Sequence, residues 1–488
     1  MAAYALTITY YYERNLTAVA ILTGYQLCGA GVAGIFIVPT ARVWGKRHLY
    51  LLGNILMIAS TAWAGASGHN YKSLLWSRVI QGVALAPFEA LVNASVGDLY
   101  FVHERGKRMA FSNVALFGGS FLTPVVAGKI AASMTWQWTF YFVAIFTGVA
   151  LPLTFFLVPE TAFRRPDYLN TDFEGDDERR SSQQLRGDRN DGTNSPSMDY
   201  SEPPEYEEKE AKSGSDERHR EQTNGAETVI PPRDSYLKTL RPFNGRKTDE
   251  SFFKLLLRPF PLFLHPGILW ACLIQGVLIG WTVFIGVVLA AIFMGPPLWF
   301  DSVKTGYLYT GAFIGSIVGL VLSGLLSDSM NRVMIKLNKG KYEPEFRILL
   351  VFFQLLFAGT GLYGFGITSS DVGRWGWLIP DVFLMFVIIG MVMGAVASAL
   401  YIVDAHREFS PVAASFNVSV QLIRTGRIAV EAFTCLLIFK NMFSFVLTFF
   451  AYDWLVESGV RTPFLAIGSI QIAVCLLSIP MCKQPSPL

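Results

Sequence analysis

Charged residues are scarce in this chain of 488 residues. Asp, Glu, Lys and Arg together make up 16% of it, and 52% of its residues are hydrophobic. A soluble globular protein carries about 25% charged residues. Many of these charges lie in one segment, from about residue 164 to residue 258, so the remainder of the chain is more apolar than the average indicates. The composition therefore excludes an ordinary soluble protein and predicts a membrane protein.

Signatures of catalysis and of cofactor binding are also missing. The sequence has no Walker motif, no HEXXH and no GxSxG pattern, which argues against an ATP-driven pump and against an enzyme. Its cysteines show no CxxC or metal-ligand spacing, so we expect reduced structural thiols, no metal and no cofactor. We also expect no nucleic-acid partner. The cysteines are Cys28, Cys272, Cys435, Cys475 and Cys482.

Long apolar stretches are what the sequence has in abundance. Each is about 20 residues long, enough to cross a bilayer core of roughly 30 Å. The stretches are continuous rather than alternating, which predicts helices and not a β-barrel. The eleven predicted spans are 17–39, 49–66, 74–98, 110–131, 138–158, 267–294, 305–326, 348–368, 376–402, 432–452 and 463–482.

Basic residues gather in the loops after the first, third, fifth, seventh and ninth spans. The positive-inside rule assigns these loops and the C-terminus to the cytosol, and the stretch before the first span to the outside. Asn15 begins an Asn-Leu-Thr sequon on that outer side, so it is a candidate glycosylation site.

An odd number of spans with an outer N-terminus suggests that a first helix is missing or truncated and that residues 1–12 are its tail. A true eleven-span protein is the alternative. A second irregularity is the stretch 411–430, which could be translated intron sequence or an amphipathic cytosolic helix.

The predicted organisation is two helical bundles joined by a polar loop. Residues 1–161 form the first bundle and residues 259–488 the second, while residues 162–258 are predicted to be a disordered cytosolic loop. With the missing helix restored, the layout is six spans plus six. The fold class is thus an all-α membrane protein of two six-helix bundles.

Several motifs resemble those of the major facilitator superfamily. The run LWSRVIQGVALAP resembles the fourth-helix motif of that family through Arg78, Gln81 and Gly82. The run GIFIVPTARVWGKR resembles the basic turn between its second and third helices. In this run Gly45, Lys46 and Arg47 match the turn, but Arg42 stands where the motif has an acidic residue.

Two further motifs support the same resemblance. The run GLLSD is the second-half copy of the basic-turn motif and retains the acidic residue as Asp328. The run ALFGGSFLTPVVAGK resembles the fifth-helix antiporter motif through Gly119, Pro124 and Gly128, although two of its glycines are replaced. GDLYFVHERGKR, VPET and YEPEFR are similar to fungal members of the drug:proton antiporter branch. The resemblance implies two halves that are each built from inverted repeats.

Polar residues inside the predicted spans are candidates for the transport site. Arg78 and Glu89 are eleven residues apart, close to three helical turns, so they share one helix face with Gln81 nearby. Intramembrane charges usually face the bundle interior or a cavity. We therefore predict that Glu89 binds a proton and that Arg78 tunes a carboxylate or holds a substrate anion. The alternative is that Arg78 only ties helix ends to backbone carbonyls.

The second half supplies Lys440 and Asn441 as substrate-binding or gating candidates, with snorkelling of the lysine to a helix end as the alternative. Asp98 and Asp404 lie at predicted cytosolic helix ends, where we expect salt bridges that gate the transporter. Small residues four apart along 115–127 predict a ridge for close helix packing, and Pro124 predicts a bend. We interpret this span as a hinge between the halves, with static packing as the alternative.

The sequence thus predicts a proton-coupled secondary transporter that exports a drug, toxin or secondary metabolite. Its partners would be the small-molecule substrate, protons and the lipid bilayer. We expect a monomer in the plasma membrane. Import of a small organic solute and a receptor or scaffold without transport are the alternatives.

Overall fold

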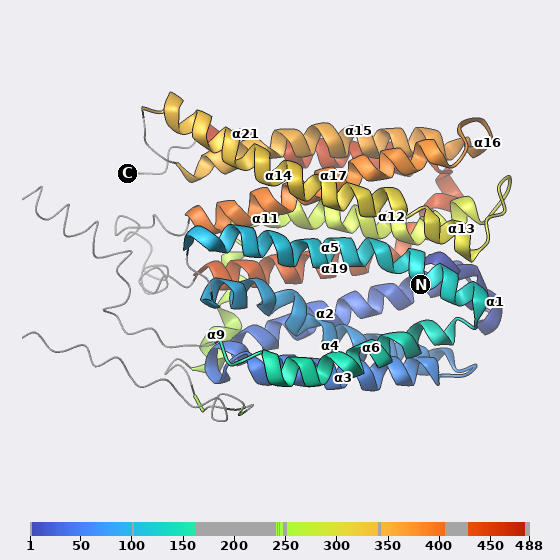
Figure 1. Ribbon diagram of the computed structural model, residues 1–488. Coiled ribbons are helices and arrows are strands. Elements are labelled where there is room, and N and C mark those ends of the chain that lie inside the picture. Colours follow the sequence, from blue (N-terminus) through green and yellow to red (C-terminus); the bar gives the residue numbers. More distant parts are fainter. Residues whose placement is uncertain are drawn as a thin grey trace, which may run out of the picture. The chain divides into compact units, whose positions relative to one another are not determined.

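The computed structural model describes residues 2–99, 102–161, 241, 243, 245–246, 251–339, 343–405 and 428–483. The chain divides into two compact units, residues 1–163 with 240–488 and residues 164–239, and only the first is described below. Every regular element among the described residues is a helix. The long helices lie side by side along roughly the same axis (Figure 1).

The first half of the chain contributes five long helices. They follow a short N-terminal turn and helix, η1 (Ala2–Tyr4) and α1 (Ala5–Tyr12). The long helices are α2 (Leu16–Trp44), α3 (Arg47–Gly65), α4 (Tyr71–Leu99), α5 (Val102–Ser133) and α6 (Gln137–Leu157).

The second half is preceded by two short helices, α9 (Phe252–Leu257) and α10 (Pro259–Leu262), and contributes six spans. The first of these is continuous through α11 (Pro266–Cys272), the π-helical η3 (Leu273–Val277) and α12 (Leu278–Phe293). The others are α13 and α14 (Ser302–Tyr307, Thr310–Leu337), η4 and α15 (Pro344–Leu349, Leu350–Ser370), α16 and α17 (Val372–Trp375, Leu378–Ala405), α19 (Ile428–Ser458), and α20 and α21 (Arg461–Leu476, Ser478–Lys483).

These helices confirm the predicted all-α membrane fold. Among the described residues, nine helical stretches are long and apolar enough to cross a membrane. The two remaining long helices, α3 and α4, run along the bundle beside them (Figure 1). They carry more polar residues, and α4 holds the predicted site residues Arg78, Gln81 and Glu89.

The two halves meet along α2 and α19, which pack against each other over much of their length. Glycines on α2 make this close approach possible. A methyl group at Gly24, Gly31 or Gly34 would run into side chains of α19, at Thr448, Met442 and Leu437 respectively. Within the first half, Gly82 on α4 lies directly against the backbone of α2 at Gln26. The close packing of α4 on α2 therefore explains the glycine of the Gln-Gly pair in the fourth-helix motif.

The second contact between the halves joins α5 to α13 and α14, and it corrects one expectation. A methyl at Gly128 would meet the carbonyl of Ser302, and a methyl at Gly306 would lie 2.9 Å from the carbonyl of Pro124. Gly119, in contrast, is exposed and has nothing within 4 Å of where its Cβ would be. The predicted ridge of small residues along 115–127 is therefore not where α5 meets the second half, since Ala115, Gly119 and Thr123 are exposed. The close approach is made instead by the face that contains Pro124 and Gly128.

Candidate functional site

Three predicted site residues from different halves come together near the middle of the bundle. The Lys440 ammonium lies 3.2 Å from Glu89 Oε2. The Asn441 side-chain amide donates a hydrogen bond of 3.1 Å to the same oxygen. The charged side chains are 17% and 13% exposed, so the ion pair is largely shielded from solvent. We call Glu89, Lys440 and Asn441 the central triad.

Helix positions explain why the triad forms at this depth. Lys440 is twelve residues after the start of the 31-residue helix α19, about 18 Å along its axis. Glu89 lies two residues after Pro87 within α4. Snorkelling of Lys440 to a helix end is not what the structure shows, because its ammonium is bound to Glu89 in the interior of the bundle. Gly31 packs against the β-carbon of Asn441, which allows α19 to approach the first half.

Arg78 and Gln81 bond to each other rather than to the central triad. An Arg78 Nη1 donates to Gln81 Oε1 at 2.5 Å, and the Gln81 amide donates to the carbonyl of Ser60 at 3.4 Å. The guanidinium lies over the Phe140 ring, 5.8 Å from its centre. Arg78 is buried, its Nε has no hydrogen-bond partner, and no described carboxylate pairs with it. The arrangement leaves a buried positive charge that an anionic group could neutralise.

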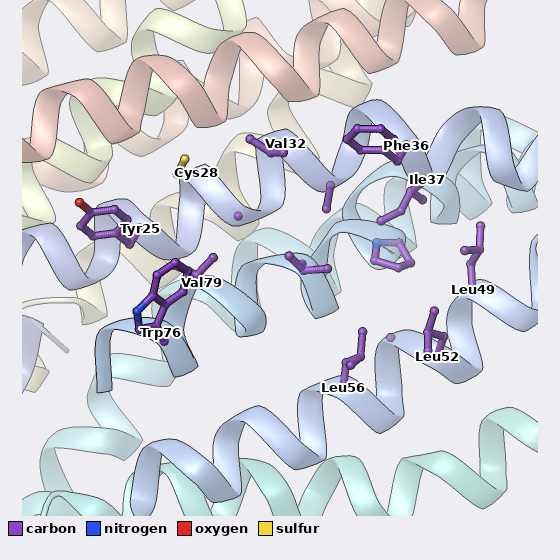
Figure 2. Close-up of a pocket in the computed structure, with 15 residues that line it drawn as sticks. Tyr25, Cys28, Val32, Phe36, Ile37, Leu49, Leu52, Leu56, Trp76 and Val79 are labelled. Carbon is purple, nitrogen blue, oxygen red and sulfur yellow. The ribbon is translucent and has the colours of Figure 1, made fainter. Parts of the chain in front are cut away.

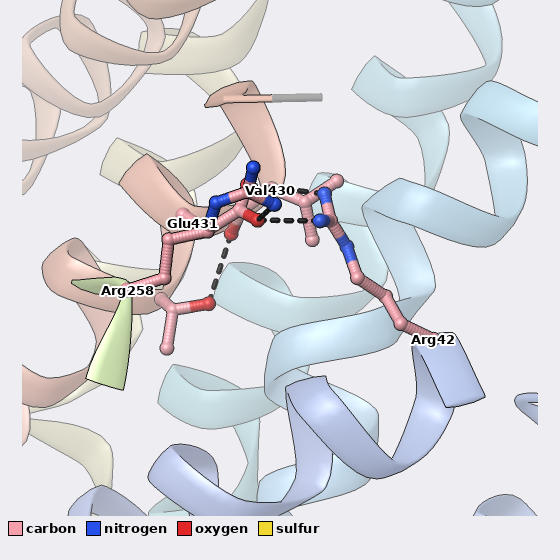
Figure 3. Close-up of polar contacts among 5 residues, drawn as sticks. Arg42, Arg258, Val430 and Glu431 are labelled. Atoms are coloured by element: carbon pink, nitrogen blue, oxygen red, sulfur yellow. Dashed lines mark hydrogen bonds and ion pairs between the residues drawn. The ribbon is translucent and has the colours of Figure 1, made fainter. Parts of the chain in front are cut away.

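A cluster of opposite charges joins the halves where α2 ends and α19 begins (Figure 3). Both oxygens of Glu431, in the first turn of α19, accept from the Arg42 guanidinium, with one Nη2–Oε2 distance of 3.0 Å. Arg258 Nη1 donates to Glu431 Oε1 at 3.3 Å. All three residues are largely buried. We call Arg42, Arg258 and Glu431 the end cluster.

Sequence reasoning missed the end cluster. The signal was present in Arg42, the basic residue at an acidic motif position, which requires an acidic partner once it is buried. That partner, Glu431, is distant in sequence and could not be paired with Arg42 by spacing.

The predicted basic turn is held by the VPET segment. Glu160 accepts hydrogen bonds from the backbone N–H groups of Lys46 and Arg47, at 2.9 and 3.2 Å. The Arg47 guanidinium is buried and donates to the carbonyl of Phe155 at 2.6 Å. Gly45 has φ +99°, and a side chain there would run into the Glu160 carboxylate. A carboxylate at the start of α3 also complements the helix dipole.

The remaining predicted residues lie apart from the triad. The backbone carbonyl of Asp328 accepts from the Arg332 guanidinium at 3.2 Å. Asn15 is exposed as the N-cap of α2, and its glycosylation stays a prediction. The side chains of Asp98 and Asp404 lie outside the described residues, as does the suspected insertion up to residue 427.

An apolar groove of about 470 Å³ lies within the first half, between α2, α3 and α4 (Figure 2). Tyr25 and Trp76 stand near one end of it and Leu49 near the other. It lies on one half, whereas the central triad joins both. The groove fits the apolar part of a ligand or a lipid chain. Its other lining residues are Cys28, Gly29, Val32, Ala33, Phe36, Ile37, Leu52, Gly53, Leu56, Val79, Val83 and Pro87.

Comparisons with known proteins agree with this architecture. The Major Facilitator Superfamily profile matches residues 1–424. "Protein HOL1" of Saccharomyces cerevisiae is 22% identical over 477 residues, covering 94% of this chain and 78% of that protein. "MFS transporter cpaT" of Aspergillus oryzae is 24% identical over 424 residues, covering 86% of this chain and 73% of that protein.

The same fold is found in a solved structure. The crystal structure of a D-xylose-proton symporter aligns with a TM-score of 0.56 and 14% sequence identity, covering 95% of this chain and 87% of that one. The profile match and the transporter relatives assign the chain to a family of transporters rather than of enzymes. The chain belongs to the Major Facilitator Superfamily of multi-pass membrane transporters.

Proposed function

We propose that this transporter exports small organic molecules, of the drug, toxin or secondary-metabolite class, in exchange for protons. The observation that carries the proposal is the central triad. It places a carboxylate on one half within ion-pairing distance of an ammonium on the other half. A proton that binds Glu89 therefore acts directly on the contact between the two halves.

The proposed cycle begins with Glu89 ionised and paired with Lys440, which holds α4 and α19 together. A proton that enters from outside neutralises Glu89 and removes the attraction. The Asn441 amide can still donate to the neutral carboxyl group, so the site stays partly satisfied. The halves then rock about the site, and the proton is released on the other side as the ion pair re-forms.

Arg78 is proposed to serve the substrate or the carboxylate from a second position on α4. Its buried guanidinium has one side-chain partner, Gln81, and no described counter-ion. A transient anionic group on the substrate would supply the missing charge.

One relative's name supports exchange with protons or another ion. The "MFS antiporter QDR3" of Candida albicans is 26% identical over 155 residues, which is 32% of this chain. The resemblance of the fifth-helix run to an antiporter motif points the same way.

Proton-coupled import is the second candidate, and a specific observation favours it. Thr123 and Ala127 replace two glycines of the antiporter motif, and Gly119 on the same helix is exposed rather than packed. The direction of transport separates the two candidates.

The test is accumulation of lipophilic dyes and drugs in a yeast strain that lacks its own efflux pumps. Expression of the chain should lower accumulation, and a proton uncoupler should abolish the difference. Glu89→Gln should lose the activity, whereas the matched control Glu457→Gln, an exposed residue at the far end of α19, should keep it. Raised accumulation would show import, and uncoupler-insensitive export would contradict the proton coupling.

A further inference from the structure

The segment just before the second half carries a stripe of large apolar side chains that the protein does not cover. Phe253, Leu257, Phe260 and Leu264 are 71%, 63%, 48% and 84% exposed. Their spacing of four, three and four residues places them on one side of a helical segment. Arg258 and Phe263, at the breaks between helices, also have helical dihedral angles. We call these four residues the apolar stripe.

The opposite side of the same segment rests on the bundle. Leu255 and Pro259 are buried, and the Phe252 ring lies 5.7 Å from that of Trp44, at the end of α2. Arg258 reaches Glu431 in the end cluster, and the Cys435 thiol donates to the carbonyl of Pro259 at 3.2 Å. One side of the segment is therefore fixed to the contact between the halves while the other is exposed.

The position of the segment indicates what covers the stripe. Helix α9 crosses the end of the bundle at a steep angle to the spanning helices (Figure 1), as a helix lying in the membrane plane does. It contacts the end of α2, and α11 begins at Pro266, directly after the stripe. The exposed side of α11, at Leu269, continues the same apolar surface toward the membrane interior. The stripe therefore lies next to the point where the first span of the second half begins.

Charge points to the kind of lipid. Lys254 is exposed beside the stripe, where its stem can follow the apolar surface and its ammonium can reach the headgroups. The sequence places this end of the bundle on the cytosolic side, whose leaflet carries anionic lipids.

We propose that residues 252–264 are an interfacial membrane element. The apolar stripe inserts at the cytosolic headgroup boundary, Lys254 pairs with anionic lipid headgroups, and this seating holds Arg258 and Pro259 against α19. The bilayer thereby stabilises the end cluster, so the contact between the halves responds to the lipid charge of the cytosolic leaflet.

The insertion is tested by fluorescence quenching on the full chain in lipid nanodiscs. The five cysteines are replaced, and a bimane label is placed at Leu257→Cys or, as a control, at Ser251→Cys, an exposed position off the stripe. Brominated lipids should quench the label at position 257 strongly and the label at 251 weakly. Equal weak quenching at both positions, with free access of iodide from water, would overturn the proposal and leave the stripe as a surface for a soluble partner.

The link to the end cluster is tested through Cys435, with the other four cysteines replaced. Its labelling by N-ethylmaleimide should be slow in nanodiscs that contain phosphatidylserine. It should be several-fold faster in the double variant Phe253→Ser with Leu257→Ser. It should also be faster when the protein with the unchanged stripe is placed in nanodiscs of phosphatidylcholine alone. Lys254→Gln should remove the difference between the two lipids.

The matched control is Phe352→Ser with Leu337→Ser, which changes two equally exposed side chains outside the segment. It should leave the labelling rate of Cys435 unchanged. If Cys435 is labelled at the same rate in Phe253→Ser with Leu257→Ser as in the protein with the unchanged apolar stripe, the segment is not held by lipid and the proposal fails. Neither measurement depends on a transported substrate, so a failure here is distinct from a failure of proton-coupled export.

Discussion

Glu89 and Lys440 belong to different halves of the transporter, and their charged atoms lie 3.2 Å apart. Because both side chains are mostly buried, neither charge is well solvated without the other. The pair therefore favours the arrangement in which α4 and α19 touch, and any event that neutralises one partner weakens that arrangement.

Lys440→Gln should abolish uncoupler-sensitive transport, because it leaves Glu89 without its cation. Protonation of Glu89 would then no longer break an ion pair between the two halves. We expect at least about a tenfold loss, the ratio that corresponds to about 1.4 kcal/mol. Initial rates of dye efflux measure it. Lys72→Gln, an exposed lysine at the start of α4, is the control and should retain activity. Full activity of Lys440→Gln would remove the ion pair from the mechanism.

Arg78→Ala should also abolish transport while the protein still folds. Arg78→Lys should not restore it, because a lysine ammonium lacks the planar guanidinium that bonds Gln81 and lies over Phe140. Efflux assays and size-exclusion profiles of the purified variants check both statements. Arg374→Ala, at an exposed residue of α16, is the control. Activity in Arg78→Lys would mean that positive charge alone suffices.

The end cluster predicts non-additive effects on stability. Arg42→Ala and Glu431→Gln should each lower the melting temperature, because Arg42→Ala removes one of the two arginines that pair with the buried Glu431, and Glu431→Gln removes the carboxylate that both arginines share. The double variant should be no less stable than the worse single variant, since the interaction is lost only once. A coupling free energy of about 0.5–3 kcal/mol is expected for residues in direct contact. Thermal unfolding of the four proteins in one detergent measures it, and strictly additive losses would show that the two residues act independently.

Gly128→Leu should disrupt the contact between α5 and α13, because a side chain there meets the carbonyl of Ser302. Gly119→Leu lies on the same helix in open space and should leave the folded yield unchanged. Size-exclusion profiles and melting temperatures compare the two variants directly. Equal tolerance at both positions would contradict the close packing of α5 on α13.

Hydropathy and motifs were sufficient to predict the all-α fold, because long apolar runs have only one stable form in lipid. They also identified all three members of the central triad as candidates, since a charged or amide group inside a span is costly and therefore informative. They did not predict that Glu89 meets Lys440 and Asn441 rather than sharing a site with Arg78. Pairing across halves depends on helix rotation, and a single sequence does not specify it.

Other features were out of reach for related physical reasons. The end cluster joins Arg42 to Glu431 across almost the whole chain. The sequence predicted close packing at Gly119, on a side of α5 that is exposed in the structure. Small residues on either side of a helix have the same spacing, so spacing alone does not identify the packed side. The role of Glu160 in the basic turn required knowing that α6 returns to the start of α3.

The glycines that line α2 where it meets α19 bear on the speed of the transport cycle. At Gly24, Gly31 and Gly34 one of the two helices presents bare backbone, so side chains there do not interlock from both sides. Surfaces of this kind can slide and turn on each other without first separating. Polar contacts mark the two ends of this line, with the Thr17–Asp453 hydrogen bond of 3.0 Å near one end and Arg42–Glu431 at the other. The rate of the conformational change would then respond to substitutions that remove the charge pair or the hydrogen bond at these two ends.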